Sequence, residues 1–126
     1  MLTNENHKRF GVLDIGSNSI RLVVFRNNTR IPLIDFNEKA FCGLGTELQI
    51  SGKLSEKGKL IALDNISRFA EIIEKMDLQD LQVIATAAIR DAADGKEFVK
   101  ELEKLFGFSV KILSGKEEAY FSALGV

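Results

Sequence analysis

A short polar run between two apolar segments is the feature that most constrains how this chain can fold. The run reads Asp14-Ile15-Gly16-Ser17-Asn18-Ser19-Ile20-Arg21. The segments 10–13 and 20–25 are apolar and strand-like, and the small residues between them favour a tight turn. The pattern therefore predicts a β-hairpin whose tip offers backbone N–H groups and small hydroxyls, an arrangement that can enclose an oxyanion.

Two charged residues flank this turn. Asp14 precedes it and can hold a divalent cation or the water shell of one. Arg21 follows it inside an apolar strand, where a guanidinium is costly to bury unless it meets an anion. The run matches neither of the better-known phosphate loops, because it lacks their glycine and lysine spacing and a strand follows it. An ordinary hairpin turn is the alternative interpretation, since Ser, Asn and Gly are common turn residues.

Composition restricts the class of protein. With 126 residues, of which 45% are hydrophobic and 28% charged, the chain suits one packed domain or part of a larger one. A net charge of −1 provides no general attraction for nucleic acid or anionic membranes, so neither is expected as a partner. The single cysteine, Cys42, excludes an internal disulfide and a cysteine-rich metal cluster. We expect a cytoplasmic protein without a membrane-spanning segment.

The periodicity of apolar residues predicts the order of elements. A polar tail at 1–9 precedes strands at 10–13, 20–25 and 30–41, and a loop then extends to residue 54. Further strands are expected at 81–85 and 108–113, separated and followed by helices. This order predicts an α/β domain with a mixed five-stranded sheet, in which an antiparallel meander joins parallel strands connected by helices.

Three helix starts are expected from capping residues. Ser55 caps the first helix, and capping boxes open the other two, at Asp94 with Glu97 and at Ser114 with Glu117. The second helix is expected to close at a glycine, Gly107. The first helix is expected to bury one amphipathic stripe, formed by Leu60, Leu63, Ile66, Ala70 and Ile73.

Three motifs together resemble a known family. They are the run 14–19, the segment Ala85-Thr86-Ala87-Ala88-Ile89-Arg90-Asp91-Ala92, and the segment Ser114-Gly115-Lys116-Glu117-Glu118-Ala119. Their order and spacing resemble those of the exopolyphosphatase and guanosine pentaphosphate phosphohydrolase family, whose first domain is actin-like, or ribonuclease H-like. The resemblance extends over nearly the whole chain from Phe10 and implies that residues 10–126 form this N-terminal domain.

The resemblance implies a phosphoanhydride hydrolase that removes terminal phosphate from inorganic polyphosphate or from pppGpp with the help of Mg²⁺. By motif position, Asp14 lies near the metal ion, and Arg21 and Arg90 hold phosphate oxygens. Glu118 activates the attacking water. The first phosphate loop is lined by Gly16, Ser17, Asn18 and Ser19.

The family pattern is incomplete in this chain. A second, glycine-rich phosphate loop is expected beyond Val126, so the sequence resembles the first half of a two-domain enzyme that is inactive as a fragment. The resemblance implies a homodimer for the full-length protein. Glu47 stands where a glycine is expected, which makes the conformation of that loop a point to test.

Alternatives from other classes stay open. A phosphate- or nucleotide-binding sensor would keep the loop without the chemistry, although a pure anion binder has no use for the Glu118 carboxylate. An actin-like kinase would use the same phosphate cradle. Arg90 follows the carboxyl end of a central strand, where ligands usually bind in an open α/β sheet, but it can also be a surface residue paired with Asp91 or Asp94. Lys116 is equally compatible with a solvated surface position, and His7 is expected to be inert.

Overall fold

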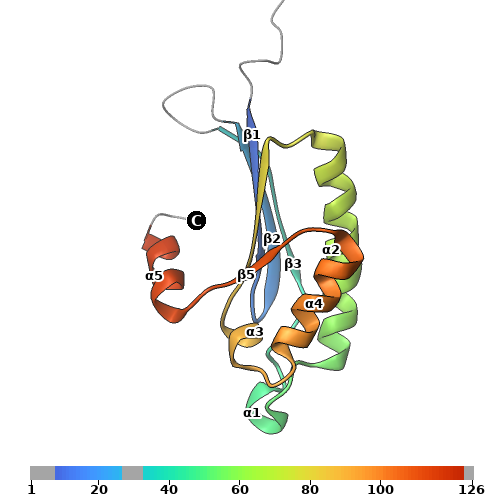
Figure 1. Cartoon of the computed structure of the whole chain (residues 1–126), viewed down its shortest axis with the longest axis vertical. Coiled ribbons are helices and arrows are strands. Elements are labelled where there is room, and N and C mark those ends of the chain that lie inside the picture. Colours follow the sequence, from blue (N-terminus) through green and yellow to red (C-terminus); the bar gives the residue numbers. More distant parts are fainter. Residues whose placement is uncertain (1–7, 27–32, 124–126) are drawn as a thin grey trace, which may run out of the picture.

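A computed structural model of the chain describes residues 8–26 and 33–123. Five strands form one sheet in the order β3-β2-β1-β4-β5, with β1 in its centre (Figure 1). Strands β1 (Arg9–Ile15), β2 (Ser19–Arg26) and β3 (Leu33–Phe41) form an antiparallel meander. Strands β4 (Asp80–Ala85) and β5 (Val110–Ile112) continue the sheet in parallel with β1. The mixed sheet predicted from the order of elements is confirmed.

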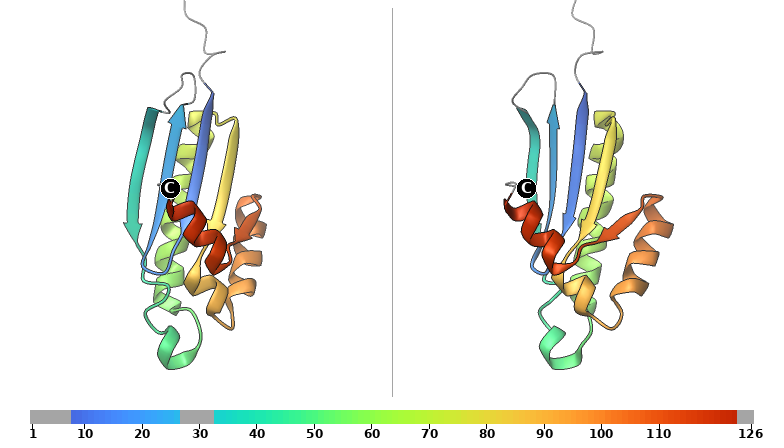
Figure 2. Two further views of the ribbon diagram at one scale, coloured as in Figure 1. Left: turned by 90° about the vertical axis from the view of Figure 1, so that its left-hand side faces the viewer. Right: turned by 60° about the vertical axis from the view of Figure 1, so that its left-hand side comes forward.

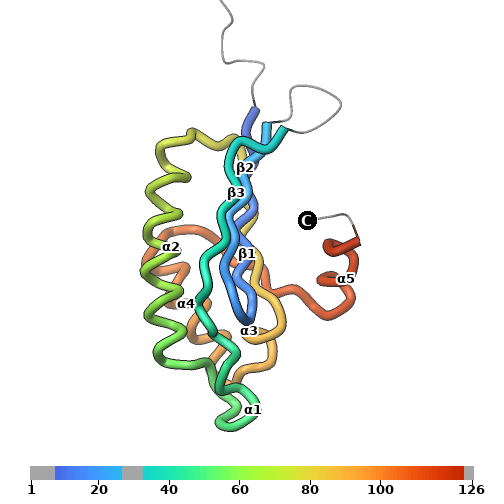
Figure 3. The backbone as a smooth tube through the Cα atoms, turned by 180° about the vertical axis from the view of Figure 1, so that it is seen from behind, coloured from blue at the N-terminus to red at the C-terminus, as the bar shows by residue number. Residues whose placement is uncertain are grey.

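Helices cover the two faces of the sheet unequally. The long helix α2 (Glu56–Met76) and helix α4 (Gly95–Phe106) lie together on one face, and α5 (Gly115–Ala123) lies on the other (Figures 1 and 3). The short helices α1 (Leu48–Ser51) and α3 (Ala87–Asp91) lie at the end of the sheet where β1 and β4 finish. No helix within the described residues is both long and apolar enough to cross a membrane.

The core lies between the sheet and the α2–α4 layer. Burial alternates along β1 and β2, so that every second side chain enters this core, as expected for strands with one solvated face. Helix α5 has no buried residue and crosses the opposite face, as Figure 2 shows. The fully buried contributors from both layers include Leu13, Ile20, Leu22, Ile66, Phe69, Phe98 and Leu102.

The predicted stripe of α2 is confirmed in part, because Ile66 is fully buried and Leu63 and Ile73 pack against the core. Leu60 is 69% exposed, and the buried positions are Gly58, Ala62, Ile66 and Phe69. A Cβ atom at position 58 would lie 2.8 Å from the carbonyl oxygen of Gly43. The helix start therefore approaches a backbone so closely that small residues occupy its inner face, and the predicted stripe is wrong at Leu60.

The capping predictions have mixed outcomes. The Ser55 hydroxyl accepts a hydrogen bond from Gly58 N at 3.0 Å, so this cap is confirmed. Gly107 ends α4 with a φ of 75°, which favours glycine. The capping box at Asp94 is wrong, because this carboxylate instead accepts the Leu54 N–H at 2.9 Å and pairs with Lys59 at 2.7 Å. Asp94 thereby ties the loop before α2 to the start of α4.

Several element boundaries also differ. Helix α1 falls in the predicted loop, and it has no buried residue whose periodicity would have revealed it. Glu47, at its start, has a φ of −108°, so this position does not need the expected glycine. Strand β5 has three residues rather than six, and β1 begins at Arg9, inside the predicted tail. His7 and the start of the strand predicted at 30–41 lie outside the described residues.

Two helix-start glycines provide a matched stability test. Gly95 opens α4 where an added Cβ would overlap the carbonyl oxygen of Ile89, whereas Gly115 opens α5 with nothing within 4 Å of such an atom. We expect Gly95→Ala to lower the free energy of unfolding by about 1–3 kcal/mol, because backbone atoms must shift. Gly115→Ala should change it by less than about 0.5 kcal/mol. Urea unfolding of both variants measures the difference, and equal effects would contradict the close approach at Gly95.

Candidate phosphate site

The turn between β1 and β2 is held by its carbonyl groups. Gly16 N donates to Ser19 O at 2.9 Å, which closes the turn. The Ser17 carbonyl accepts from Gly45 N at 2.9 Å, and the Asn18 carbonyl accepts from the amides of Cys42 and Gly43 at 2.8 and 3.0 Å. No backbone acceptor for the Ser17 and Asn18 amides occurs among the described residues. The carbonyl groups are thus occupied, while these N–H groups remain available to an anion.

The segment 42–45, after β3, supports this turn, and the sequence analysis did not assign it that role. Leu44 is fully buried and its carbonyl accepts from Ser55 N at 3.0 Å, which anchors the segment to the start of α2. A Cβ atom on Gly45 would lie 3.2 Å from that of Ser17 and 3.4 Å from that of Ala88. The absence of a side chain at Gly45 allows the turn and α3 to approach each other. The glycines at 43 and 45 were the only sequence signal for this contact.

The carboxyl end of β4 brings a second segment beside the carboxyl end of β1. Thr86 N donates to the Ile15 carbonyl at 3.1 Å, so the residue after β4 is fixed beside the end of β1. Helix α3 follows at once and carries Arg90 in its last turn. Thr86 is 9% exposed and lines a pocket with Asp14, a role that the sequence analysis missed. Because β1 and β4 are parallel neighbours, the residues that follow their carboxyl ends lie side by side.

Arg90 links three segments through one guanidinium group. Its Nη1 donates to the Leu113 carbonyl at 3.0 Å and to Glu118 Oε2 at 3.1 Å. Its Nε contacts Asp91 at 3.3 Å, and no partner for Nη2 occurs among the described residues. The hydrogen bond that Arg90 donates to Glu118 is the largest cause of a raised pKa for Arg90, so the guanidinium keeps its charge. The contact with Asp91 is the surface pairing that was predicted as the alternative. The bond to Glu118 is an additional contact that this alternative did not include.

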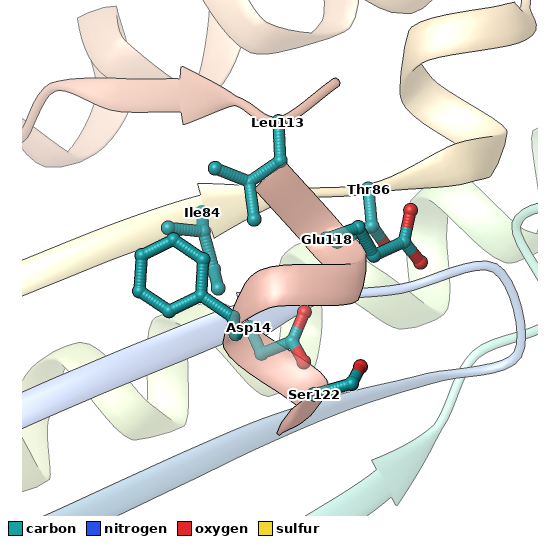
Figure 4. Close-up of a pocket in the computed structure, with 7 residues that line it drawn as sticks. Asp14, Ile84, Thr86, Leu113, Glu118 and Ser122 are labelled. Carbon is teal, nitrogen blue, oxygen red and sulfur yellow. The ribbon is translucent and has the colours of Figure 1, made fainter. Parts of the chain in front are cut away.

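The two adjacent glutamates of α5 have different surroundings. Glu117 accepts the Ser114 N–H at 3.0 Å, and the Ser114 hydroxyl accepts the Glu117 N–H at 3.1 Å, which confirms the predicted capping box. Glu117 also pairs with Lys111 at 2.9 Å. Glu118 is turned toward Arg90 and lines a pocket beneath α5 (Figure 4). The structure therefore separates a capping glutamate from one that faces the site.

That pocket combines polar and apolar walls. Asp14, Thr86, Glu118 and Ser122 provide oxygen atoms, as Figure 4 shows. The apolar part consists of Ile84, Leu113 and Phe121. Because strands β1 and β4 contribute two sides and α5 covers the third, the pocket exists only when α5 is docked on the sheet.

Asp14 has an unusual environment for a carboxylate. Its Oδ1 atom is buried and has no hydrogen-bond partner. Burial is the largest cause of a raised pKa for Asp14, the nearby Glu118 raises it further, and Arg21 opposes the rise. A buried oxygen without a partner, beside a second carboxylate, suits a cation that the protein binds through few side chains. Mg²⁺ commonly binds through one or two carboxylates together with substrate phosphates.

A complete metal site formed by side chains alone is not present in the described ranges. No cluster of three or more His, Cys, Asp or Glu side chains able to hold a metal ion occurs between residues 8 and 26 or between 33 and 123. The fit to Mg²⁺ therefore concerns Asp14 and Glu118, with the remaining ligands left to water and phosphate oxygens.

Arg21 lies on the same face of the sheet as Asp14, directly opposite it in the β1–β2 register. Its Nη1 donates to Asn37 Oδ1 on β3 at 2.9 Å, which directs the side chain toward the edge of the sheet. Contacts among the described residues thus join Glu118 to Arg90, and Arg21 to Asn37. The convergence of Arg21 and Arg90 on one anion stays a prediction.

Comparisons with known proteins agree with this geometry. The model of the Ppx/GppA phosphatase family matches residues 23–126. The chain belongs to this family. Exopolyphosphatase 1 of Mycobacterium tuberculosis is 31% identical over 121 residues, which cover 94% of this chain and 35% of that protein. A guanosine-5'-triphosphate,3'-diphosphate pyrophosphatase of Aeromonas hydrophila is 28% identical over 118 residues, covering 90% of this chain and 23% of the relative.

Solved structures of the Ppx/GppA family share the fold. A family member from Aquifex aeolicus matches with a TM-score of 0.84 at 24% identity, over 88% of this chain and 36% of that one. An exopolyphosphatase from Cytophaga hutchinsonii matches with a TM-score of 0.81 at 25% identity, over 86% and 35% of the two chains. The predicted actin-like α/β fold is confirmed. The chain spans about a third or less of the length of these relatives.

The surroundings of Asp14 predict an effect of pH on stability. Because its pKa is raised in the folded protein, ionisation of Asp14 costs stability once the pH exceeds the unfolded value of about 3.9. We expect Asp14→Asn to increase the free energy of unfolding at pH 7. This gain should be absent below the unfolded value, grow as the pH rises from that value toward the raised pKa of Asp14, and level off above it. Urea unfolding at several pH values, without divalent cations, measures it.

The control for this experiment is Asp77→Asn. Asp77 is an exposed aspartate at the end of α2, so its replacement removes an equal charge from a solvent-accessible position and should not reproduce the gain expected for Asp14→Asn. A loss of stability at pH 7 in Asp14→Asn would show that the carboxylate makes a net stabilising contact in the folded protein.

Proposed function

We propose that residues 10–126 form the N-terminal, actin-like domain of a phosphoanhydride hydrolase, which removes the terminal phosphate of inorganic polyphosphate or pppGpp. The observation that carries the proposal is the position of Glu118. Its carboxylate is bonded to Arg90 and shares a pocket with Asp14, at the edge of the sheet where β1 and β4 end. The mycobacterial and Aeromonas relatives are named for activities of this class, which supports the choice.

The phosphate loop would bind by its backbone. The amides of Ser17 and Asn18, together with the hydroxyls of Ser17 and Ser19, can donate to oxygens of the terminal phosphate, and the lack of a Cβ on Gly16 keeps the turn closed. Arg90 would hold the same phosphate through Nη2, which has no partner in the described part of the chain. Such fixed donors stabilise negative charge that develops on the transferred group.

Glu118 would act on the attacking water. The water oxygen forms a new bond to the terminal phosphorus, the bridging P–O bond breaks, and Glu118 accepts the proton that the water loses. Glu118 lies in the first turn of α5, and its carboxylate lines the pocket together with Asp14. Asp14, with its unpartnered oxygen, would hold Mg²⁺, which neutralises phosphate charge when bound. Positioning and charge stabilisation carry most of the work in phosphoryl transfer.

A phosphate-binding sensor is the less well-supported alternative. Two carboxylates, Asp14 and Glu118, line the pocket, and the Coulombic effect of Glu118 already raises the pKa of Asp14. A site that only binds anions would be weakened by both groups. A hydrolase uses one of them for water and the other for a cation, so the enzyme explains their proximity better.

Glutamates 117 and 118 allow the role of the carboxylate to be tested against a matched control. In the intact protein that contains this sequence, Glu118→Gln keeps the shape of the side chain but removes its basicity. We expect turnover to fall by roughly 10²–10⁴-fold with unchanged unfolding. Glu117→Gln should retain activity, since Gln serves the same reciprocal cap. Phosphate release from polyphosphate and from pppGpp measures both variants, and an inactive Glu117→Gln beside an active Glu118→Gln would refute the assignment.

Arg90 is tested by charge and by shape. Arg90→Ala should reduce turnover by roughly 10²–10³-fold, since a donor to the phosphate is lost. The same change removes the bonds that Arg90 makes to Leu113 and Glu118, so it should also loosen α5. Arg90→Lys keeps the charge without the planar guanidinium, so its turnover should fall between that of Arg90→Ala and that of the unchanged protein. Turnover of Arg90→Ala equal to that of the unchanged protein would contradict a role in phosphate binding.

A further inference from the structure

Three charged residues form a row across the face of the sheet that carries α5. In the strand register, Asp14 lies opposite Arg21, and Arg21 lies opposite Lys39. The side chains of directly paired residues point to the same face, and this is the face turned away from α2, because the neighbouring Leu13 and Leu22 enter the core. The row therefore extends from the pocket at Asp14 to the edge strand β3.

Lys39 and Arg21 are like charges at directly opposite positions. Such a cross-strand pair destabilises a sheet unless an anion lies between or beside the two groups. Asp14 lies opposite Arg21 and offsets part of its charge. The same attraction lowers the pKa of Asp14, against the larger effect of burial. Lys39 is one strand further from that carboxylate, so its charge is not offset in the same way.

The acidic residues of β3 form ion pairs with residues other than Lys39. Asp35 pairs with Arg9 and Arg26 at 3.0 and 2.8 Å. Glu38 pairs with Arg68 of α2, on the opposite face of the sheet. Lys39 is exposed, and no ion pair involves it within the part of the chain that the structure describes. By contrast, Lys59 and Lys111 both contact carboxylates.

Arg21 is oriented away from the phosphate loop. The loop joins β2 at Ser19, whereas the hydrogen bond from Arg21 goes to Asn37, which lies opposite Val23, further along β2. Two residues of strand separate Arg21 from Ser19, about 7 Å of rise. A single phosphate seated on the loop amides would therefore leave Arg21 and Lys39 to another anionic group.

We propose that Lys39 and Arg21, with Asn37 bracing the guanidinium, bind the phosphate groups that follow the terminal one in a linear phosphoanhydride chain. This subsite rests on the proposed function, because it continues the path of a substrate whose terminal phosphate occupies the loop. The ligand class is a chain of linked phosphates, supplied either as inorganic polyphosphate or as a nucleoside 5′-triphosphate. Orthophosphate is too short to reach it.

The test is a binding experiment on the chain itself. Amide spectra of the ¹⁵N-labelled chain are titrated with orthophosphate, with tripolyphosphate and with GTP at low ionic strength. We expect tripolyphosphate to bind more tightly than orthophosphate. Lys39→Gln should weaken tripolyphosphate binding roughly tenfold, the scale of one charge-assisted hydrogen bond, and change orthophosphate binding less than about twofold. Lys39→Arg should retain most of the affinity.

Lys111→Gln is the matched control. Lys111 is also an exposed strand lysine on the same level of the sheet, since it lies opposite Ile84, which in turn lies opposite Asp14. Its replacement removes the same charge at the other edge. Equal weakening by Lys39→Gln and Lys111→Gln would overturn the subsite in favour of a net-charge effect, and so would equal weakening for orthophosphate and tripolyphosphate.

The remaining outcomes separate this inference from the function on which it rests. Orthophosphate binding at residues 16–19 without tighter binding of tripolyphosphate or GTP would overturn the subsite alone. Absence of binding by all three ligands would overturn the subsite, whereas the proposed function is tested separately by the turnover of Glu118→Gln in the intact protein. A Lys39→Gln loss confined to tripolyphosphate would support the subsite with inorganic polyphosphate as its source, and a loss confined to GTP would support it with a nucleotide.

Discussion

Strand β1 hydrogen-bonds to β2 on one side and to β4 on the other, and both pairings are needed to assemble the candidate site. The antiparallel pairing forms the turn and sets Arg21 opposite Asp14. The parallel pairing brings Thr86 and the helix that carries Arg90 to the end of the same strand. Every group of the proposed phosphate site therefore depends on β1 lying in the centre of the sheet, where neither edge is exposed.

Stability and proposed function oppose each other at Asp14. A half-buried carboxylate with a raised pKa and an unpartnered oxygen lowers the stability of the folded chain. Helix α5 adds little in return, because it buries no residue and is held by polar contacts at its first turn. These features lower the stability of a purely structural domain, and they are typical of a site that binds a cation or an anion.

Most of the fold could be predicted from local patterns. The hairpin, the order of strands and helices, and the caps at Ser55, Gly107 and Ser114 all depend on residues close together in the sequence. Asp94 could not be predicted in the same way. Its position suited a capping box, but its oxygens instead accept a hydrogen bond from the Leu54 amide and pair with the Lys59 ammonium, two groups that are distant in the sequence. The exposure of Leu60 has a similar cause, because the backbone of Gly43 limits the size of the residues that face it at the start of α2.

For the candidate site, the sequence by itself determined the chemical groups: a small-residue turn, an arginine after β4 and a carboxylate after a capping glutamate. Consecutive residues of a helix are rotated by about 100°, so the different surroundings of Glu117 and Glu118 were predictable. Only the tertiary structure decided that Arg90 bonds Glu118, that Gly45 packs on Ser17, and that Arg21 donates a hydrogen bond to Asn37. These contacts join residues far apart in the chain, and their geometry depends on strand register and helix docking, which no local pattern encodes.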